Sequence, residues 1–291
     1  MTAFNFFQLA DTQFGMSASL SNRSDAQIAD MASRGMKVRR VAPFEGFGPE
    51  TAAFEEAIAE ANRLKPQFVI VCGDMVNDPD SSDERAEVLR VAGQLDPSIP
   101  IHWVAGNHDI GADTIVPTPA SVKAYRDVWG DDYFSFQHGG TSFIVLDTSV
   151  MDHPEQVPGE LESQMRFLEA ELRAARKRDT SQIIVFTHYP FFLDNPDEGD
   201  GYFTVAKERR LPVIELFRKY GVSAVFAGHW HRNHYAEDNG MLMVSTGPVG
   251  FPLGDDASGY RIVEVHDGGL SHEYHELLNG QPPAGNEEDK E

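Results

Sequence analysis

The sequence predicts an α/β protein in which two mixed sheets pack together with helices outside, a four-layer α-β-β-α sandwich. Two observations lead to this prediction. Short β-branched and aromatic runs alternate with amphipathic helical segments over the first half of the chain, and hairpin signals become frequent later. Strands joined through helices pair in parallel, whereas strands joined by tight turns pair antiparallel. Both kinds of connection therefore indicate mixed sheets with helices on their outer faces.

The elements of the first half follow from hydrophobic periodicity. The chain opens on an apolar, β-rich run at 4–10, and a second such run ends at Gly73. Between them Phe54, Ile58 and Ala61 recur at helical spacing. We expect strands at 4–10, 67–72 and 101–105, and helices at 51–65, 83–95 and 120–129.

The second half combines a hairpin, two further strand–helix units and a terminal run of strands. Gly139-Gly140 separates two β-rich runs, and Asp267-Gly268-Gly269 separates the last pair, as expected of hairpin turns. We expect helices at 160–178 and 205–220, and strands at 133–136, 141–147, 183–186, 224–226, 241–245, 260–265 and 271–274.

Nothing in the chain divides it into separate domains. The 291 residues contain no repeat of fixed period and no linker-like stretch, which predicts a single domain over 1–280. The remaining residues, 281–291, are expected to form an acidic, disordered tail.

The composition is strongly acidic, with 24 Lys and Arg against 46 Asp and Glu and a net charge of −22. Such a surface repels phosphate backbones, so we expect no nucleic-acid binding through a basic patch. A phosphorylated substrate is compatible with this charge, because bound metal ions can reverse the field inside a site.

The chain also gives expectations about location. No stretch approaches the ~18 uncharged apolar residues of a membrane span, and the first residues are typical of a strand rather than a signal peptide. The single cysteine, Cys72, excludes an internal disulfide and suits a reducing cytoplasm. Its apolar neighbours predict a buried, unreactive thiol.

Five short polar clusters each follow a segment expected to be a strand. They place Asp, Asn and His at the carboxyl ends of strands, where open α/β sheets bind ligands. Such a set is suited to holding two divalent metals with a hydrolytic water between them. The clusters are Asp11-Thr12-Gln13, Gly73-Asp74-Met75-Val76-Asn77, Gly106-Asn107-His108-Asp109, Thr187-His188 and Gly228-His229-Trp230-His231.

The residue types in these clusters match the ligands that such metals prefer. The carboxylate of Asp74 has two oxygens and can bridge two cations, which a neutral imidazole cannot do. Imidazoles bind Zn, Fe or Mn, and the amide oxygen of Asn107 is a weaker, neutral ligand. Each residue alone is more often a helix cap, a turn former or a structural histidine. The occurrence of all five clusters at strand ends favours the metal site.

In this order the clusters resemble the signature of the calcineurin-like metallophosphoesterase superfamily, from Asp11 to His231. Longer runs resemble one branch of it, the calcineurin-like phosphoesterase domain-containing proteins of animals, for which Ser/Thr phosphatase activity has been proposed. These runs are Ala10 to Gly15, Gly106 to Gly111, Trp129 to Phe136 and Gly228 to Asn233. That branch shares the Gln of the first cluster, where most of the superfamily has His.

The resemblance implies a site residue by residue. One metal would be held by Asp11, Asp74 and His231, with Gln13 at the position of the usual His. The second would be held by Asp74, Asn107, His188 and His229. The two ions would be Mn, Fe or Zn. His108 would be the acid that protonates the leaving oxygen or steadies the phosphoryl group, and Asp109 would orient it by accepting a hydrogen bond from its imidazole.

The expected mechanism follows from the charges. Two cations ~3.5–4 Å apart lower the pKa of a bridging water, and the resulting hydroxide attacks phosphorus in line. The metals also stabilise the growing negative charge, so no covalent phosphoenzyme is expected. Neither Cys72 nor a serine is needed as a nucleophile.

Gln13 makes the two metal positions unequal. An amide oxygen is a harder and poorer donor to Fe or Zn than an imidazole. We therefore expect weaker binding at the Asp11 position, with a relative preference for Mn²⁺ or Mg²⁺. Two alternatives are that Gln13 reaches the metal through a water or only hydrogen-bonds Asp11.

Three further regions are candidates for contact with the substrate. The loop 195–203 follows His188 and carries Tyr202, which would pack on the substrate, or would anchor a solvated loop. Arg232, beside His231, would bind a phosphate or pair with surface acids. The long insertion 15–48 holds the only local basic cluster and is expected to be a loop, partly paired or steering an anionic substrate; its basic residues are Arg23, Arg34, Lys37, Arg39 and Arg40.

The leading functional prediction is a dinuclear metal-dependent phosphatase that hydrolyses phosphate monoesters, with phosphoproteins and phosphorylated small molecules as candidate substrates. A phosphodiesterase acting on cyclic nucleotides or nucleotide diphosphate links would use the same metals and water. A non-catalytic protein-binding scaffold is the alternative of another class. The presence of both His108 and Asp109 favours an enzyme, because scaffold relatives tend to lose that His.

Overall fold

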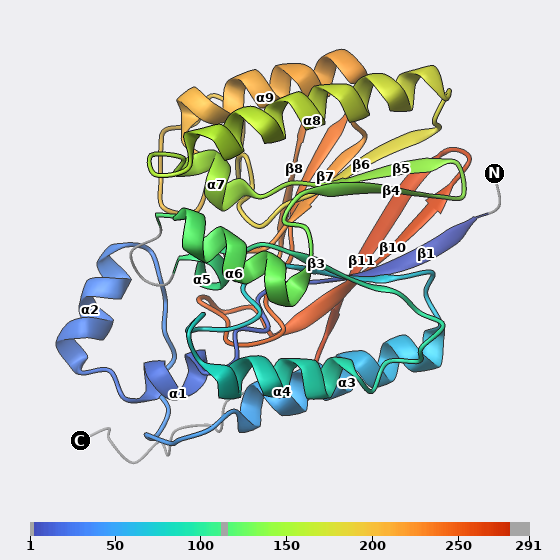
Figure 1. The fold of residues 1–291 in the computed structure, drawn as a ribbon. Helices are drawn as coiled ribbons and strands as arrows, with labels where there is room; N and C mark the ends of the chain where they lie inside the picture. The colour runs from blue at the N-terminus through green and yellow to red at the C-terminus, as the bar shows by residue number, and fades with distance from the viewer. Residues whose placement is uncertain (1–2, 112–115, 280–291) are drawn as a thin grey trace.

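In the computed structural model, which describes residues 3–111 and 116–279, two sheets pack face to face between layers of helices (Figure 1). The first sheet has the order β11-β10-β1-β2-β3 and the second the order β4-β5-β6-β7-β9-β8. Both contain parallel and antiparallel pairs, so the predicted four-layer sandwich of mixed sheets is confirmed. The strands are β1 Phe4–Leu9, β2 Val69–Cys72, β3 Ile101–Val104, β4 Phe134–His138, β5 Thr141–Val145, β6 Gln182–Phe186, β7 Ala224–Ala227, β8 His234–Asp238, β9 Met241–Ser245, β10 Gly259–His266 and β11 Gly269–Glu276.

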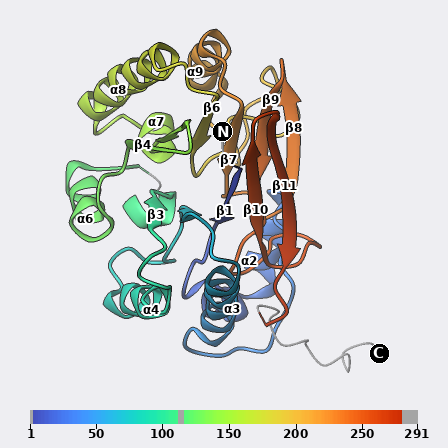
Figure 2. The same ribbon diagram turned by 90° about the vertical axis from the view of Figure 1, so that its right-hand side faces the viewer.

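The helices of the outer layers are amphipathic, and each pair covers one sheet. Helices α3 and α4 pack on the first sheet, whereas α8 and α9 pack on the second, on opposite sides of the molecule (Figures 1 and 2). The helices are α1 Met16–Ser21, α2 Asp25–Ser33, α3 Gly48–Leu64, α4 Ser82–Ala92, α5 Asn107–Ile110, α6 Pro119–Trp129, α7 Thr148–Asp152, α8 Pro158–Lys177 and α9 Lys207–Tyr220.

The core between the sheets consists largely of phenylalanine. Phe6 stacks on Phe68 at 4.8 Å and meets the edges of Phe143, Phe186 and Phe226 from the facing sheet at 5.5 to 5.9 Å. Aromatic pairs of this kind contribute about 0.5–1.5 kcal/mol each beyond the area they bury. This contact fixes the first sheet against the second, and with it the loops at the carboxyl ends of β1, β2, β6 and β7.

The largest error of the sequence-based prediction concerns the insertion 15–48. It was expected to be a loop, but it contains two helices, α1 and α2, which lie beyond one end of the sheets (Figure 1). Ser24 and Gln27 form a capping box at the start of α2, a signal readable in the sequence. The short helices α5 and α7 and the edge strand β8 were also missed. The expected tail at 281–291 lies outside the described residues.

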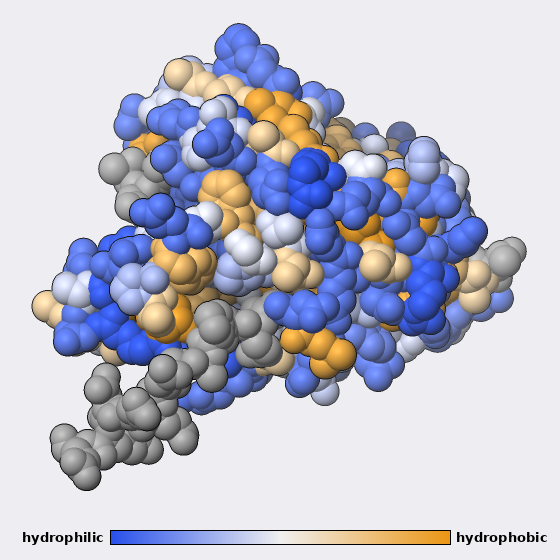
Figure 3. All heavy atoms as spheres, turned by 90° about the horizontal axis from the view of Figure 1, so that it is seen from below, coloured by the Kyte–Doolittle hydropathy of each residue, from blue (hydrophilic) through white to orange (hydrophobic). Residues whose placement is uncertain are grey.

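The surface of the molecule on the side of its first helical layer is largely hydrophilic. Seen from the side of α3 and α4, hydrophilic residues dominate, and apolar residues form small, separate patches (Figure 3). Across the described part of the chain, every helix falls short of the apolar length that a membrane crossing requires.

Candidate metal centre

All seven predicted metal ligands lie at the carboxyl ends of strands and are buried. Asp11 and Gln13 follow β1, Asp74 follows β2 and Asn107 begins α5 after β3. His188 follows β6, and His229 and His231 follow β7. Their exposed fractions are 4% or less, although none is an apolar residue. Polar groups are rarely buried without partners, so this concentration points to a ligand held in common.

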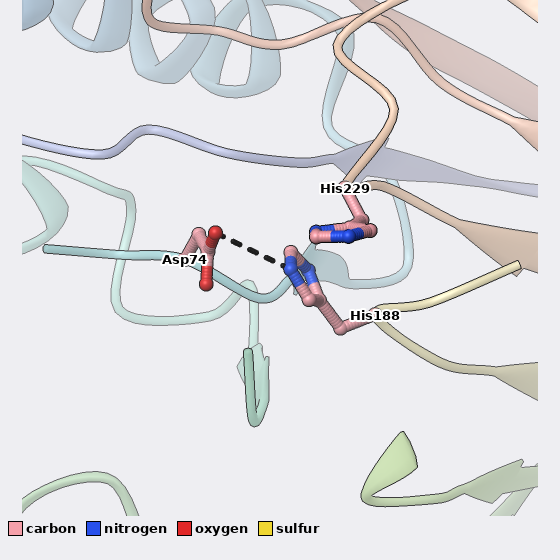
Figure 4. Close-up of side chains that lie close together, drawn as sticks. All are labelled: Asp74, His188 and His229. Atoms are coloured by element: carbon pink, nitrogen blue, oxygen red, sulfur yellow. Dashed lines mark ion pairs between the residues drawn. The ribbon is translucent and has the colours of Figure 1, made fainter. Parts of the chain in front are cut away.

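The ligand atoms form two groups that share one carboxylate. Asp74, His188 and His229 make up one group, and Asp11, Asp74 and His231 make up the other. Within each group the candidate ligand atoms lie within 4.8 Å of one another. Figure 4 shows Asp74, His188 and His229 converging from three separate loops. A carboxylate common to two such groups is suited to bridging two cations.

In the first group, the partners of His188 fix which ring nitrogen can bind a metal. Nδ1 lies 2.8 Å from the carbonyl oxygen of Cys72, which can only accept, so Nδ1 carries a hydrogen. Nε2 lies 3.3 Å from Asp74 Oδ2 and 3.1 Å from Asn107 Oδ1. Metal-ligating histidines commonly have this outer contact to a carbonyl. The geometry therefore makes Nε2 the donor atom, facing two oxygen ligands.

His231 repeats this arrangement in the second group. Its Nδ1 lies 2.6 Å from the carbonyl oxygen of Phe251, and its Nε2 lies 3.2 Å from Asp11 Oδ1. Asp11 is oriented in turn by the backbone N–H of His229, which donates to both carboxylate oxygens at 3.0 and 3.1 Å. Both histidines thus present Nε2 to a carboxylate.

Gln13 supplies the observation that tests whether a metal fits the second group. Its side chain is buried, and its Oε1 has no hydrogen-bond partner in the described part of the chain. An unsatisfied buried oxygen costs about 1–3 kcal/mol, so a group that supplies positive charge is the expected partner. No hydrogen bond joins the side chains of Gln13 and Asp11 within the described residues. The donor set, two carboxylates, an imidazole and an orphaned amide oxygen, fits a divalent cation.

The backbone at the site adopts conformations that side chains rarely take. Among the described residues, five of the eight non-glycine residues with positive φ are candidate ligands. Such conformations cost of order 1–3 kcal/mol each and cluster at functional sites. The five are Asp11, Gln13, Asp74, His229 and His231, with φ from 35° to 66°.

Two glycines permit the close approach of the loops. A Cβ at Gly106 would lie 2.2 Å from Asp74 Oδ1, and one at Gly73 would lie 2.3 Å from His188 Nδ1. Contacts under about 3 Å are excluded for carbon, so these positions accept only glycine unless a ligand moves. The Gly-Asp and Gly-Asn pairs of the sequence are thus requirements of packing.

Burial and the neighbouring carboxylates shift the pKa values of the histidines in opposite directions. Burial opposes charge on His188, but attraction to Asp74 outweighs it and raises its pKa to about 9. The pKa of His231 is also raised, because Asp11 outweighs burial. Burial and repulsion by His188 lower the pKa of His229 well below its ordinary value. In the metal-free protein, the carboxylates of Asp74 and Asp11 therefore favour the protonated forms of His188 and His231.

The expected role of Asp109 is wrong. Its carboxylate does not meet the His108 imidazole but accepts hydrogen bonds from the backbone N–H groups of Gly106, Asp74 and Met75 at 2.8 to 2.9 Å. His108 Nδ1 instead lies 2.8 Å from the carbonyl oxygen of Asn77. A buried carboxylate is better compensated by several fixed N–H donors than by one ring. Asp109 therefore joins two ligand loops, and Asn77, the last residue of its cluster, orients His108.

Comparison with known proteins agrees with this geometry. The family model described as calcineurin-like phosphoesterase matches residues 6–233. The chain belongs to the calcineurin-like phosphoesterase family. It is 35% identical over 280 residues to "Serine/threonine-protein phosphatase CPPED1" of Danio rerio, covering 94% of this chain and 85% of that protein. It is thus a hydrolase of phosphate esters, and the family site has two metal ions.

Solved structures show the same fold at low identity. A purple acid phosphatase from yellow lupin superposes with a TM-score of 0.65 at 13% identity, covering 97% of this chain and 52% of that one. A dimetal phosphatase from Danio rerio superposes with a TM-score of 0.56 at 17% identity, covering 90% and 95%. These likenesses establish the metallophosphoesterase sandwich.

A cavity of about 580 Å³ opens beside the ligands of this phosphoesterase. Gln13, Asp74, Asn107, His108, His229 and His231 line it, together with Tyr202. The carbonyl oxygen of Tyr202 lies 3.1 Å from His229 Nε2, and its ring lies 5.2 Å from the His229 ring. The loop 195–203 thus reaches the site as expected.

The structure does not bring Arg232 to this cavity. Its guanidinium donates to the carbonyl oxygens of Gly35 and Leu253 and lies over the Trp230 ring. Residues of the insertion that were not predicted as site residues do line the cavity: Met16, Ser19, Leu20, Arg23, Met31, Arg34 and Met36. Two of them, Arg23 and Arg34, belong to the basic cluster that is readable in the sequence.

Proposed function

We propose that the protein is a dinuclear metal-dependent phosphatase that hydrolyses phosphate monoesters, with phosphoserine and phosphothreonine side chains as candidate substrates. The observation that carries the proposal is the pair of buried ligand groups sharing Asp74 beside an open cavity. The printed name of the Danio rerio relative supports the choice of monoesters.

In this proposal Asp11, Gln13, Asp74 and His231 hold one cation, and Asp74, Asn107, His188 and His229 hold the other. The histidine-rich group suits Fe, Zn or Mn, and the oxygen-rich group with Gln13 suits Mn²⁺ or Mg²⁺. Two bound cations would supply an activated water and offset the charge of the phosphate oxygens.

The remaining residues position the substrate and move a proton. His108 Nδ1 donates to Asn77 O, so Nε2 is the nitrogen left to face the cavity that His108 lines. There it protonates the leaving oxygen or donates a hydrogen bond to the phosphoryl group. Asn107 and Tyr202 line the same cavity and contact the ester.

The single cysteine supports a cytoplasmic location, which stays a prediction. Cys72 is fully buried, and burial raises the pKa of its thiol far above the ordinary value. It contributes its carbonyl oxygen to His188 and takes no part in the chemistry.

The proposal is tested by measuring hydrolysis of 4-nitrophenyl phosphate and bis(4-nitrophenyl) phosphate by Mn²⁺-reconstituted protein, with metal content measured on the same sample. We expect close to two metal ions per chain and faster hydrolysis of the monoester. Preferential hydrolysis of the diester would show a phosphodiesterase instead. A phosphoserine peptide and cyclic AMP extend the same comparison to biological esters.

A His108→Ala variant separates an enzyme from a scaffold. General acid groups typically contribute about 10²–10⁴-fold to rate, so turnover should fall by that order. Metal content should stay unchanged, because His108 belongs to neither ligand group. Full activity in this variant would contradict the role given to His108.

A further inference from the structure

The cavity beside the metal centre is larger than a phosphoryl group needs. Its volume of about 580 Å³ lies within the range of small-molecule sites, roughly 300–1,000 Å³. Metal ligands form part of the cavity wall, and residues of the insertion 15–48 form another part. A phosphoryl group held at the ligands leaves the rest of the cavity to the leaving group of the ester.

The wall formed by the insertion is apolar at four of its seven residues. Met16, Leu20, Met31 and Met36 line it together with Leu253, and each is 8% exposed or less. They belong with Phe251 to one small hydrophobic cluster, separate from the core between the sheets. Methionine side chains are flexible and adapt to the shape of an apolar group. The leaving group therefore meets an adaptable apolar surface.

Arg23, which lines this cavity, has a side chain without an ion pair among the described residues. Three basic residues of the insertion form ion pairs: Lys37 with Asp255, Arg40 with Asp25, and Arg34 with Asp30. The guanidinium of Arg23 has no ion pair or hydrogen bond to any residue that the structure describes. Arg23 is half-buried and lines the cavity, so its guanidinium is available to an anionic group held there.

The backbone around Arg23 is held in place. Its N–H donates to Leu20 O at 3.1 Å, and its carbonyl oxygen accepts from Arg40 Nη1 at 2.7 Å. The insertion is also tied to the body of the protein, since Ser17 N donates to Glu50 Oε1 and Arg232 donates to Gly35 O and Leu253 O. The apolar wall and the backbone that carries Arg23 are thus a preformed part of the site, which lowers the entropic cost of binding.

We propose that this cavity selects phosphate monoesters whose leaving group carries an apolar segment followed by a second negative charge, and that Arg23 binds this charge. The inference rests on the proposed function, because it assigns the leaving group of the same reaction. The guanidinium matches carboxylates and phosphates through paired N–H donors, so the second anionic group is of that kind. The insertion then determines specificity, and the metals determine chemistry.

The test uses alkyl monophosphates of increasing chain length that end in a carboxylate, beside carboxamide-ended analogues of the same length. In wild type we expect kcat/KM to favour the carboxylate by about tenfold at the best chain length, as for a hydrogen bond to a charged group. In Arg23→Gln this ratio should fall to about one, whereas Arg23→Lys should retain part of it. Arg166→Gln is the matched control, because Arg166 is 70% exposed on α8 and outside the cavity lining.

Phosphoserine peptides with Leu-Glu or Leu-Gln after the phosphoserine form a second substrate pair. The proposal is supported if either substrate pair shows a preference for the carboxylate in wild type that disappears in Arg23→Gln. A preference in the alkyl pair indicates a small-molecule substrate, and a preference in the peptide pair indicates a phosphopeptide. Equal ratios in wild type and Arg23→Gln, with hydrolysis and metal content intact, would overturn it while leaving the proposed function standing. Absence of hydrolysis of every ester by metal-loaded wild type would instead contradict the proposed function itself.

Discussion

The two ligand groups of the metal centre differ in how completely the protein supplies them. The His188 group has two imidazoles, a carboxylate and the Asn107 amide, and His188 Nε2 lies 3.1 Å from Asn107 Oδ1 and 3.3 Å from Asp74 Oδ2. The Asp11 group has two carboxylates, one imidazole and Gln13, whose Oε1 has no hydrogen-bond partner among the residues that the structure describes. The amide oxygen of Asn107 in the first group therefore has a partner within the group, whereas the amide oxygen of Gln13 in the second group has none among the described residues.

This difference indicates that the two positions serve different purposes. A histidine-rich set of ligands binds Fe or Zn tightly, so its metal ion exchanges slowly. A set rich in harder oxygen donors exchanges its cation more readily and favours Mn²⁺ or Mg²⁺. We therefore expect one resident ion and one that follows the available metal.

Among the substitutions that test this comparison, Asp74→Asn should have the largest effect on metal binding, because it removes the carboxylate common to both groups. We expect loss of both ions and a fall in turnover beyond the 10–100-fold typical of changes to outer partners of metal ligands. Metal analysis by mass spectrometry and a phosphatase assay measure both effects. Asp127→Asn, an exposed substitution on α6, is the control. Retention of two ions by Asp74→Asn would refute the shared carboxylate.

Separate substitutions of His188 and His231 test whether the groups are independent. We expect His188→Ala to lose the tightly held ion and His231→Ala to lose the exchangeable one. Metal content after dialysis should therefore fall to about one ion in His188→Ala, with the remaining ion weakly held. Identical metal content and affinity in the two variants would mean that the groups bind as a single unit.

Gln13→His should make the two groups alike. An imidazole in place of the amide should raise Zn²⁺ affinity at the second position by about 10–100-fold, the scale on which metal sites respond to ligand environment. Titration of metal-free protein with Zn²⁺ and Mn²⁺ measures the change. Unchanged affinity would show that Gln13 does not bind the ion directly.

The smallest expected effect is on stability. Asp109→Asn places an amide where the carboxylate accepts three short hydrogen bonds from backbone N–H groups. We expect the free energy of unfolding of metal-free protein to fall by about 1–3 kcal/mol, measured by urea titration. Loss of activity without any loss of stability would instead favour a direct role for Asp109 in the reaction.

The sequence predicts the fold well, and it correctly places the candidate ligands at the ends of strands, because strand topology determines where residues after β1, β2, β6 and β7 must lie. It does not predict the partner of Asp109, since a carboxylate can accept from an imidazole or from backbone N–H groups and chain position does not distinguish them. The sequence did not predict the helices of the insertion because they are short. The only clear signal is the capping box formed by Ser24 and Gln27 at the start of α2. The basic cluster of the insertion included Arg23, but only the structure shows that Arg23 lines the cavity while Lys37 and Arg40 form ion pairs.

The carbonyl oxygens of Cys72 and Phe251 hold the two histidines in the tautomer that exposes Nε2. Because every amino acid has a main-chain carbonyl, mutation can change the side chains at both positions without erasing this control. Substitution at positions 72 and 251 is limited instead by packing, because both side chains are buried in hydrophobic clusters. What the enzyme must keep here is the position of two backbone carbonyl groups, which does not depend on one particular side chain.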